Sequence, residues 1–112
     1  MTGSANFVHP VDVCWTPTDP GIKRRVLTWN DDLMLVEVAF DKGAVGALHQ
    51  HPHIQASYVA AGRVEVTIAG VTETLDTGAS FIVPSNAVHG CVALEAGRLI
   101  DSFTPMRGEF VG

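Results

Sequence analysis

The segment "RVEVTIAGVTETLD", residues 63–76, decides the fold class of this chain. In its first half Val64, Val66 and Ile68 alternate with polar residues. Successive side chains of a β-strand point to opposite faces, so this alternation is typical of a half-buried strand. Gly70 then predicts a hairpin turn, after which residues 71–76 return as the partner strand.

The rest of the chain repeats this rhythm of short strands and turn residues. The apolar run 33–40, "LMLVEVAF", lies between the turn-prone segments "WNDD" and "DKG". No segment predicts a helix. Further strands are expected within 44–51, 55–62, 80–84, 89–97 and 98–105, with the last two forming a hairpin around "EAG". Short strands about every eight to ten residues, separated by Gly, Pro, Asn and Asp, predict an all-β sandwich or barrel.

The length and composition indicate one filled, soluble domain. A chain of 112 residues is too short to divide into two halves that each bury a useful core, so residues 1–112 form a single domain. With 46% hydrophobic and 17% charged residues, the chain is globular and not disordered. The net charge of −5 argues against nucleic acid or an anionic membrane as a partner.

The cysteines and the N-terminal sequence indicate a cytoplasmic protein. Cys14 and Cys91 are too few for a disulfide framework, so both are expected to be reduced thiols. Residues 1–15 show no signal-peptide pattern, and no apolar run approaches the ~20 residues of a membrane span. The N-terminal segment of about 20 residues holds three of the six prolines. We expect it to wrap the outside of the barrel or to pair with the edge of a second subunit in a homodimer.

A run of histidines, "HQHPHIQ" at residues 49–55, is the candidate site. On a strand, His49, His51, His53 and Gln55 would project to one face. Two imidazoles two residues apart can hold one metal ion, Gln55 can add an amide oxygen, and His89 can close the site from another strand. Burying several polar rings without a partner costs free energy, which favours a metal site. The spacing alone leaves a solvated loop open as the alternative.

Two spaced motifs carry a resemblance to a known family. In residues 43–62, Gly43 is followed at intervals of five, one, three and six residues by His49, His51, Gln55 and Gly62. In residues 78–93, Gly78 is followed at intervals of five, one and two by Pro84, Asn86 and His89. This pair of motifs resembles those of the cupin family. The resemblance implies an antiparallel jelly-roll barrel, usually dimeric, with a metal ion inside.

The resemblance also implies the metal ligands, which are His49, His51, Gln55 and His89. His53 falls outside this set and is expected either behind the ligands, in contact with them, or in the pocket wall. Three imidazoles and an amide suit zinc, nickel, manganese, iron or cobalt equally.

The sequence departs from the cupin pattern in three places: Gln55 replaces a glutamate, Asn86 a glycine, and Ala93 a frequent asparagine. Neutral Gln55 leaves the full charge on the metal, which weakens its binding but makes it a better Lewis acid. It also removes the carboxylate that suits oxygen-activating iron, so it disfavours dioxygenase chemistry.

A narrower resemblance covers roughly residues 20–110. This part is similar to the small pectin- and alginate-degradation cupins, which convert 4,5-unsaturated monouronates to linear keto sugars. Its more specific elements are "HPHIQ" at 51–55 and "DSFTPMR" at 101–107. Ile54 departs from the acidic residue expected in that group. The resemblance implies a small-molecule substrate, an unsaturated uronate.

The tail "RLIDSFTPMR" adds candidate catalytic residues. Leu99, Asp101 and Phe103 share one face of a strand. If this face is internal, burial raises the pKa of Asp101, which can then act as a general acid or base, with Phe103 as an apolar wall. Arg107 can contact a substrate carboxylate with two donors. The alternative is that this face meets solvent and Arg107 is a surface charge.

The sequence therefore predicts a metal-dependent enzyme that opens and tautomerises an unsaturated uronate without a redox change. Three rivals stay open: a metal-dependent dioxygenase, a non-enzymatic module that binds a sugar or small acid, and a metal-free barrel. Cys91 is in phase with His89 and can reach the pocket, although a buried, inert thiol is the simpler interpretation. Tyr58 is expected on the opposite face from the metal.

Overall fold

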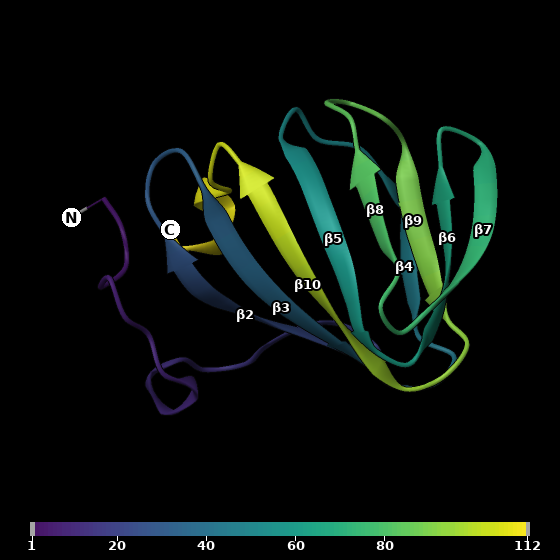
Figure 1. Cartoon of the computed structure of the whole chain (residues 1–112), viewed down its shortest axis with the longest axis horizontal. Helices are drawn as coiled ribbons and strands as arrows, with labels where there is room; N and C mark the ends of the chain where they lie inside the picture. Colours follow the sequence, from purple (N-terminus) through teal and green to yellow (C-terminus); the bar gives the residue numbers. More distant parts are fainter. Residues whose placement is uncertain (1, 112) are drawn as a thin grey trace.

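Two antiparallel β-sheets face each other in the computed structural model, which describes residues 2–111 (Figure 1). One sheet has the strand order β1-β2-β3-β10-β5-β8 and the other β4-β9-β6-β7. The strands are β1 (Thr16–Asp19), β2 (Ile22–Trp29), β3 (Met34–Phe40), β4 (Val45–His49), β5 (Ile54–Ala61), β6 (Arg63–Ile68), β7 (Val71–Asp76), β8 (Ser80–Val83), β9 (His89–Ala93) and β10 (Gly97–Thr104). Two single 3₁₀ turns, η1 (Pro10–Asp12) and η2 (Gly108–Phe110), are the only helical elements within residues 2–111. The predicted all-β jelly roll is confirmed.

The alternating segment behaves as its pattern predicts. Val64 and Val66 are buried, with 5% of their surface exposed, and pack with Val59 and Leu99 from the opposite sheet. Burying a valine side chain contributes about 1.5–3 kcal/mol, so this stripe is a main reason for the two sheets to stack. A second apolar cluster, formed by Met34, Val36 and Phe103, fills the part of the interior next to β2.

The turn between β6 and β7 follows from its two residues. Ala69 and Gly70 have φ angles of 49° and 82°, and Ile68 pairs directly with Val71. A two-residue hairpin with two positive φ angles matches the right-handed twist of its strands. The hairpin predicted at Gly70 is therefore confirmed.

The predicted hairpin around "EAG" is wrong. β9 pairs with β4 and β6, whereas β10 pairs with β3 and β5 in the other sheet. Residues 94–96 thus carry the chain from one sheet to the other. Alternation identifies a strand, but the packing of distant segments decides which strand becomes its partner.

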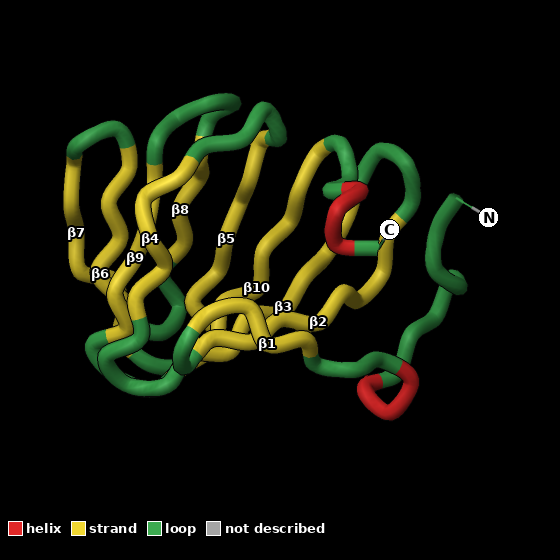
Figure 2. The backbone as a smooth tube through the Cα atoms, turned by 180° about the vertical axis from the view of Figure 1, so that it is seen from behind, coloured by secondary structure: helices red, strands yellow, loops and turns green. Residues whose placement is uncertain are grey.

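The N-terminal segment lies at the outer edge of the larger sheet. β1 pairs with β2 of the same chain, so it belongs to the barrel and not to a free arm. Before it, Ser4 donates a hydrogen bond to the Trp29 carbonyl at 2.9 Å, and η1 lies outside the sheets (Figure 2). Pairing of this segment with a second subunit stays a prediction. Within residues 2–111, no helix has the length and apolar character needed to cross a membrane.

Gly97, at the start of β10, provides a test of this crossing between sheets. A Cβ atom there would overlap the carbonyl of Ala61. We expect Gly97→Ala to lower the free energy of unfolding by about 1–3 kcal/mol, the usual cost of overpacking. Gly108→Ala is the matched control, because its Cβ would meet no atom closer than 3.9 Å. Equal stability of the two variants in denaturant titrations would contradict the close approach of the Gly97 backbone to the Ala61 carbonyl, where the chain enters the larger sheet.

Candidate metal and catalytic site

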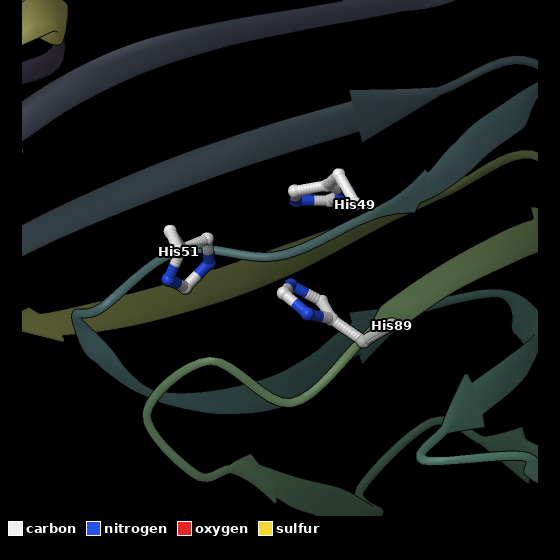
Figure 3. Close-up of side chains that lie close together, drawn as sticks. All are labelled: His49, His51 and His89. Atoms are coloured by element: carbon white, nitrogen blue, oxygen red, sulfur yellow. The ribbon is translucent and has the colours of Figure 1, made fainter.

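Three histidines converge between the two sheets (Figure 3). His49 ends β4 and pairs in register with His89, which begins β9, while His51 follows in the next loop. The ring centroids of His49 and His51 lie 4.3 and 4.8 Å from that of His89. One nitrogen from each ring lies within 4.8 Å of the others, so the cluster can hold a metal ion.

The run 49–55 is not one strand, and this part of the prediction is wrong. β4 ends at His49, residues 50–53 form a loop, and β5 begins at Ile54 in the other sheet. Pro52 lacks a backbone N–H and so cannot complete a strand ladder in the middle of the run. His49, His51 and His89, the three histidines of the implied ligand set, nevertheless converge, and His53 is not among them.

Backbone contacts orient all three imidazoles in the same way. Each Nδ1 lies within hydrogen-bond distance of a carbonyl oxygen two residues away along the chain. The acceptors for His49, His51 and His89 are Ala47, His53 and Ala87, at 2.8, 3.0 and 2.9 Å. A neutral imidazole that donates from Nδ1 carries its lone pair on Nε2. Three Nε2 lone pairs are therefore available to a metal, and the carbonyls hold the rings in place.

Two contacts show that this arrangement fits a cation. Nε2 of His89 is buried and has no hydrogen-bond partner within the described part of the chain. Nε2 of His51 faces Oε1 of Gln55 at 3.2 Å, while its Nδ1 faces a carbonyl. A neutral ring has only one N–H, and burial, aided by Arg107, lowers the pKa of His51, which disfavours the doubly protonated ring. A divalent cation between these acceptors satisfies them all.

A buried hydrogen-bond chain leads from this cluster to Asp101. The Gln55 amide donates from Nε2 to Ser57 Oγ at 3.0 Å, and the Ser57 hydroxyl donates to Asp101 Oδ1 at 2.6 Å. Ser57 of β5 and Asp101 of β10 are direct partners in the sheet. Burial raises the pKa of Asp101 to about 6, although the Ser57 hydrogen bond and the charge of Arg107 act in the opposite direction. The carboxyl group can therefore gain and lose a proton near neutral pH.

A cavity of about 370 Å³ joins these groups. The predicted ligand His51 is not among the residues that line it. The candidate site residues that do line it are His49, Gln55, His89, Cys91, Leu99, Asp101, Phe103 and Arg107. The face carrying Leu99, Asp101 and Phe103 is thus internal, with exposures of 5, 6 and 3%. Such a volume lies in the usual range for small-molecule sites.

Arg107 lies at this cavity next to two aromatic rings. Its guanidinium carbon lies 4.4 Å from the centre of the Phe110 ring and 5.2 Å from that of Phe103. Its Nε donates to Glu109 at 2.7 Å. Stacking on aromatic faces holds the guanidinium flat while leaving N–H donors for an anion.

Three residues of the site were missed in the sequence. Arg24 and Phe110 line the cavity, with the Arg24 guanidinium 3.8 Å from the centre of the Phe110 ring, and Ser57 lies behind it. The signal was available for two of them, because Arg24 is in phase with buried Ile22, and Ser57 with Gln55. Phe110 follows the last strand, where alternation gives no information.

Cys91 and Tyr58 lie on opposite faces of their sheets with respect to the cavity. Cys91 lines the cavity, and burial raises the pKa of its thiol to about 11, so it stays protonated and unreactive near neutral pH. Tyr58 is half-exposed and lies on the outer face of β5, as predicted.

Comparison with known proteins agrees with the resemblance seen in the sequence. The family model described as "Cupin domain" matches residues 36–103. The "Pectin degradation protein KdgF" of Dickeya dadantii (strain 3937) is 48% identical over 99 residues, which cover 87% of this chain and 90% of that protein.

Two solved structures are similar over nearly their whole length. An RmlC-like cupin from Shewanella frigidimarina NCIMB 400 is 41% identical and superposes with a TM-score of 0.94, covering 98% of this chain and 99% of that chain. KdgF from Halomonas sp. is 40% identical with a TM-score of 0.89, covering 95% and 98%. Fold, motifs and relatives agree, and the chain belongs to the cupin domain family.

Proposed function

We propose that this protein is a metal-dependent enzyme that converts a 4,5-unsaturated uronate into its linear keto form. The observation that carries the proposal is the position of Asp101, a buried carboxyl group that lines the same cavity as His49 and His89 of the three-histidine cluster. A general acid or base beside a metal-holding cluster suits an isomerisation driven by proton transfer.

The size and charge of the cavity support a monosaccharide acid as substrate. A volume of about 370 Å³ accommodates one sugar ring. Arg107 and Arg24 place two cationic groups at the cavity, where they favour a carboxylate. Over 99 aligned residues the chain is 48% identical to a pectin degradation protein, and pectin is built from uronates. The homodimer and the cytoplasmic location expected from the sequence stay predictions.

The reaction rearranges atoms without gain or loss. The anomeric hydroxyl loses its proton and becomes an aldehyde, while the bond from the anomeric carbon to the ring oxygen breaks. The ring oxygen keeps the electron pair and becomes an enolate at C5. C4 then takes up a proton, and the enolate becomes a ketone, so the substrate is isomerised and no oxidant is needed.

The residues of this chain have separate tasks in that sequence. A divalent metal held by His49, His51, Gln55 and His89 would supply Lewis acidity, which neutral Gln55 leaves undiminished. Arg107 binds the substrate carboxylate and orients the ring, and Phe103 excludes water from one side. Asp101 moves the proton that ends on C4, because its raised pKa allows both forms near neutral pH.

The ligand assignment predicts that substitution of His89 and substitution of His53 have different effects on metal binding. We expect His89→Ala to lose most metal binding, measured by metal content after dialysis, because it removes one of four donors. His53→Ala should keep its metal, since His53 lies outside the three-histidine cluster. Equal metal loss in both variants would contradict the assignment.

The substrate assignment is tested by turnover. We expect the protein to accelerate the loss of ultraviolet absorbance of a 4,5-unsaturated galacturonate monomer above the protein-free rate, and a chelator to abolish the acceleration. Oxygen uptake during the reaction would point to a dioxygenase instead. Binding of the monomer without acceleration by metal-loaded protein would point to a binding module and sink the enzymatic proposal.

The role of Asp101 is tested by Asp101→Asn, which keeps the shape of the side chain and removes its charge. We expect turnover to fall by about 100-fold or more, the usual contribution of a general acid or base. Metal content should be unchanged, because Asp101 is not among the ligands. A variant with full turnover would exclude Asp101 as the proton carrier.

The same variant also tests the pKa of Asp101 through stability. Because the pKa is raised from 3.8 to about 6, protonated Asp101 contributes stability that is fully present below pH 3.8 and is lost as pH rises through 6. In chelator-treated protein, Asp101→Asn should therefore become more stable relative to the parent by up to about 3 kcal/mol between pH 4 and pH 7. The measurement is a denaturant titration of both proteins at each pH, and Asp12→Asn, at an exposed carboxylate, is the control for the substitution itself.

A further inference from the structure

Ser57 lies between the two functional parts of the site. Only 3% of its surface is exposed, and its hydroxyl oxygen contacts both the Gln55 amide and the Asp101 carboxyl group. The strand register holds these contacts, because Ser57 pairs with Asp101, and Gln55 with Phe103, across β5 and β10. Neither the family motifs nor the proposed reaction assigns a role to Ser57.

The number of hydrogens available between Gln55, Ser57 and Asp101 determines which group donates and which accepts in each hydrogen bond. A serine hydroxyl has one hydrogen, and in its ionised form Asp101 can only accept, so in that form the Ser57 hydrogen belongs to Asp101 Oδ1. The Ser57 oxygen must then accept from Gln55, which requires the amide nitrogen on that side. Gln55 Oε1 consequently faces His51 Nε2 and the histidine cluster. The reversed amide would place two acceptors together at Ser57 and an N–H against the metal site.

We propose that Ser57 is a positioning residue that holds the Gln55 amide with its oxygen toward the metal and leaves one oxygen of Asp101 for the substrate. Ser57 occupies Asp101 Oδ1, and the carboxylate makes no other side-chain hydrogen bond within residues 2–111. The second oxygen is therefore left for proton transfer in the cavity that Asp101 lines. This inference rests on the proposed function for its catalytic half, whereas its metal half stands on the hydrogen-bond chain alone.

A double-mutant cycle on metal affinity separates positioning from packing. In the natural Gln55 background, Ser57→Ala should weaken Zn²⁺ binding about threefold to tenfold, the effect of one lost hydrogen bond, because the amide becomes free to turn its nitrogen to the metal. In a Gln55→Glu background the same change should alter affinity by less than about twofold, since both oxygens of a carboxylate can ligate. Affinity is measured by competition with a chromogenic chelator, and the visible spectrum of the Co²⁺-loaded protein reports the ligand set.

Ser102→Ala is the matched control. Ser102 is the neighbour of Asp101 on β10, faces the outer side of the sheet, and makes no side-chain hydrogen bond within the described residues. It should leave both metal affinity and turnover unchanged. Ser57→Cys, which leaves no cavity but donates only weakly, should behave like Ser57→Ala and guards against a folding defect of the alanine variant.

The outcomes distinguish this inference from the proposed function. Equal weakening of Zn²⁺ binding by Ser57→Ala in both backgrounds would mean that Ser57 acts through packing, and would overturn the inference. Weaker Zn²⁺ binding by Ser57→Ala only in the Gln55 background, together with a fall in kcat of Ser57→Ala that exceeds the change in KM, would support both the metal half and the catalytic half of the inference. If the metal affinities follow the expected cycle but the parent protein does not turn over the uronate, the proposed function and the catalytic half of the inference are wrong and the metal half stands.

Discussion

The interior of this barrel is constrained by the cost of burying polar groups without partners. Its apolar core encloses several polar side chains, among them His51, Gln55, Ser57, His89 and Asp101. An unpaired polar group in such surroundings costs about 1–3 kcal/mol, so these side chains cannot be arranged independently. His51, Gln55, Ser57 and Asp101 form one chain of hydrogen-bond contacts, and the His89 ring packs against His51 at its end. At the histidine end of this chain, His51 Nε2 faces Gln55 Oε1 and His89 Nε2 has no hydrogen-bond donor within the described residues, and a cation fits between these acceptors.

The two sheets have different tasks in maintaining this arrangement. β4 and β9 of the smaller sheet present His49 and His89 as register partners. β5 and β10 of the larger sheet present the glutamine, serine and aspartate through their own register. The candidate site therefore spans the gap between the sheets, and the apolar packing that holds the sheets together also sets the distance between the histidine cluster and Asp101. The geometry of the candidate site and the stability of the fold therefore depend on the same layer of side chains between the two sheets.

Much of the fold could be read from local patterns, and the errors have physical causes. The stripe of Val64 and Val66 and the turn at Gly70 depend on a few consecutive residues, and both are as predicted. The hairpin around "EAG" was wrong because partner choice depends on segments far apart in the chain, such as β3 and β5 beside β10. The histidine run was wrongly placed on one strand because Pro52 and the loop around it turn the chain from one sheet to the other.

The sequence by itself determined which chemistry is available: histidines and a glutamine at family spacing, and an aspartate in phase with apolar residues. Residue identity, spacing and alternation are properties of the linear chain, so they can be read without knowing which strands pair or which sheets stack. Only the tertiary structure decided which histidines meet, that the face of Asp101 is internal, and that Ser57 joins it to Gln55. These facts depend on strand register and on the stacking of two sheets. Both arise from the burial of residues distant in sequence, which no local pattern contains.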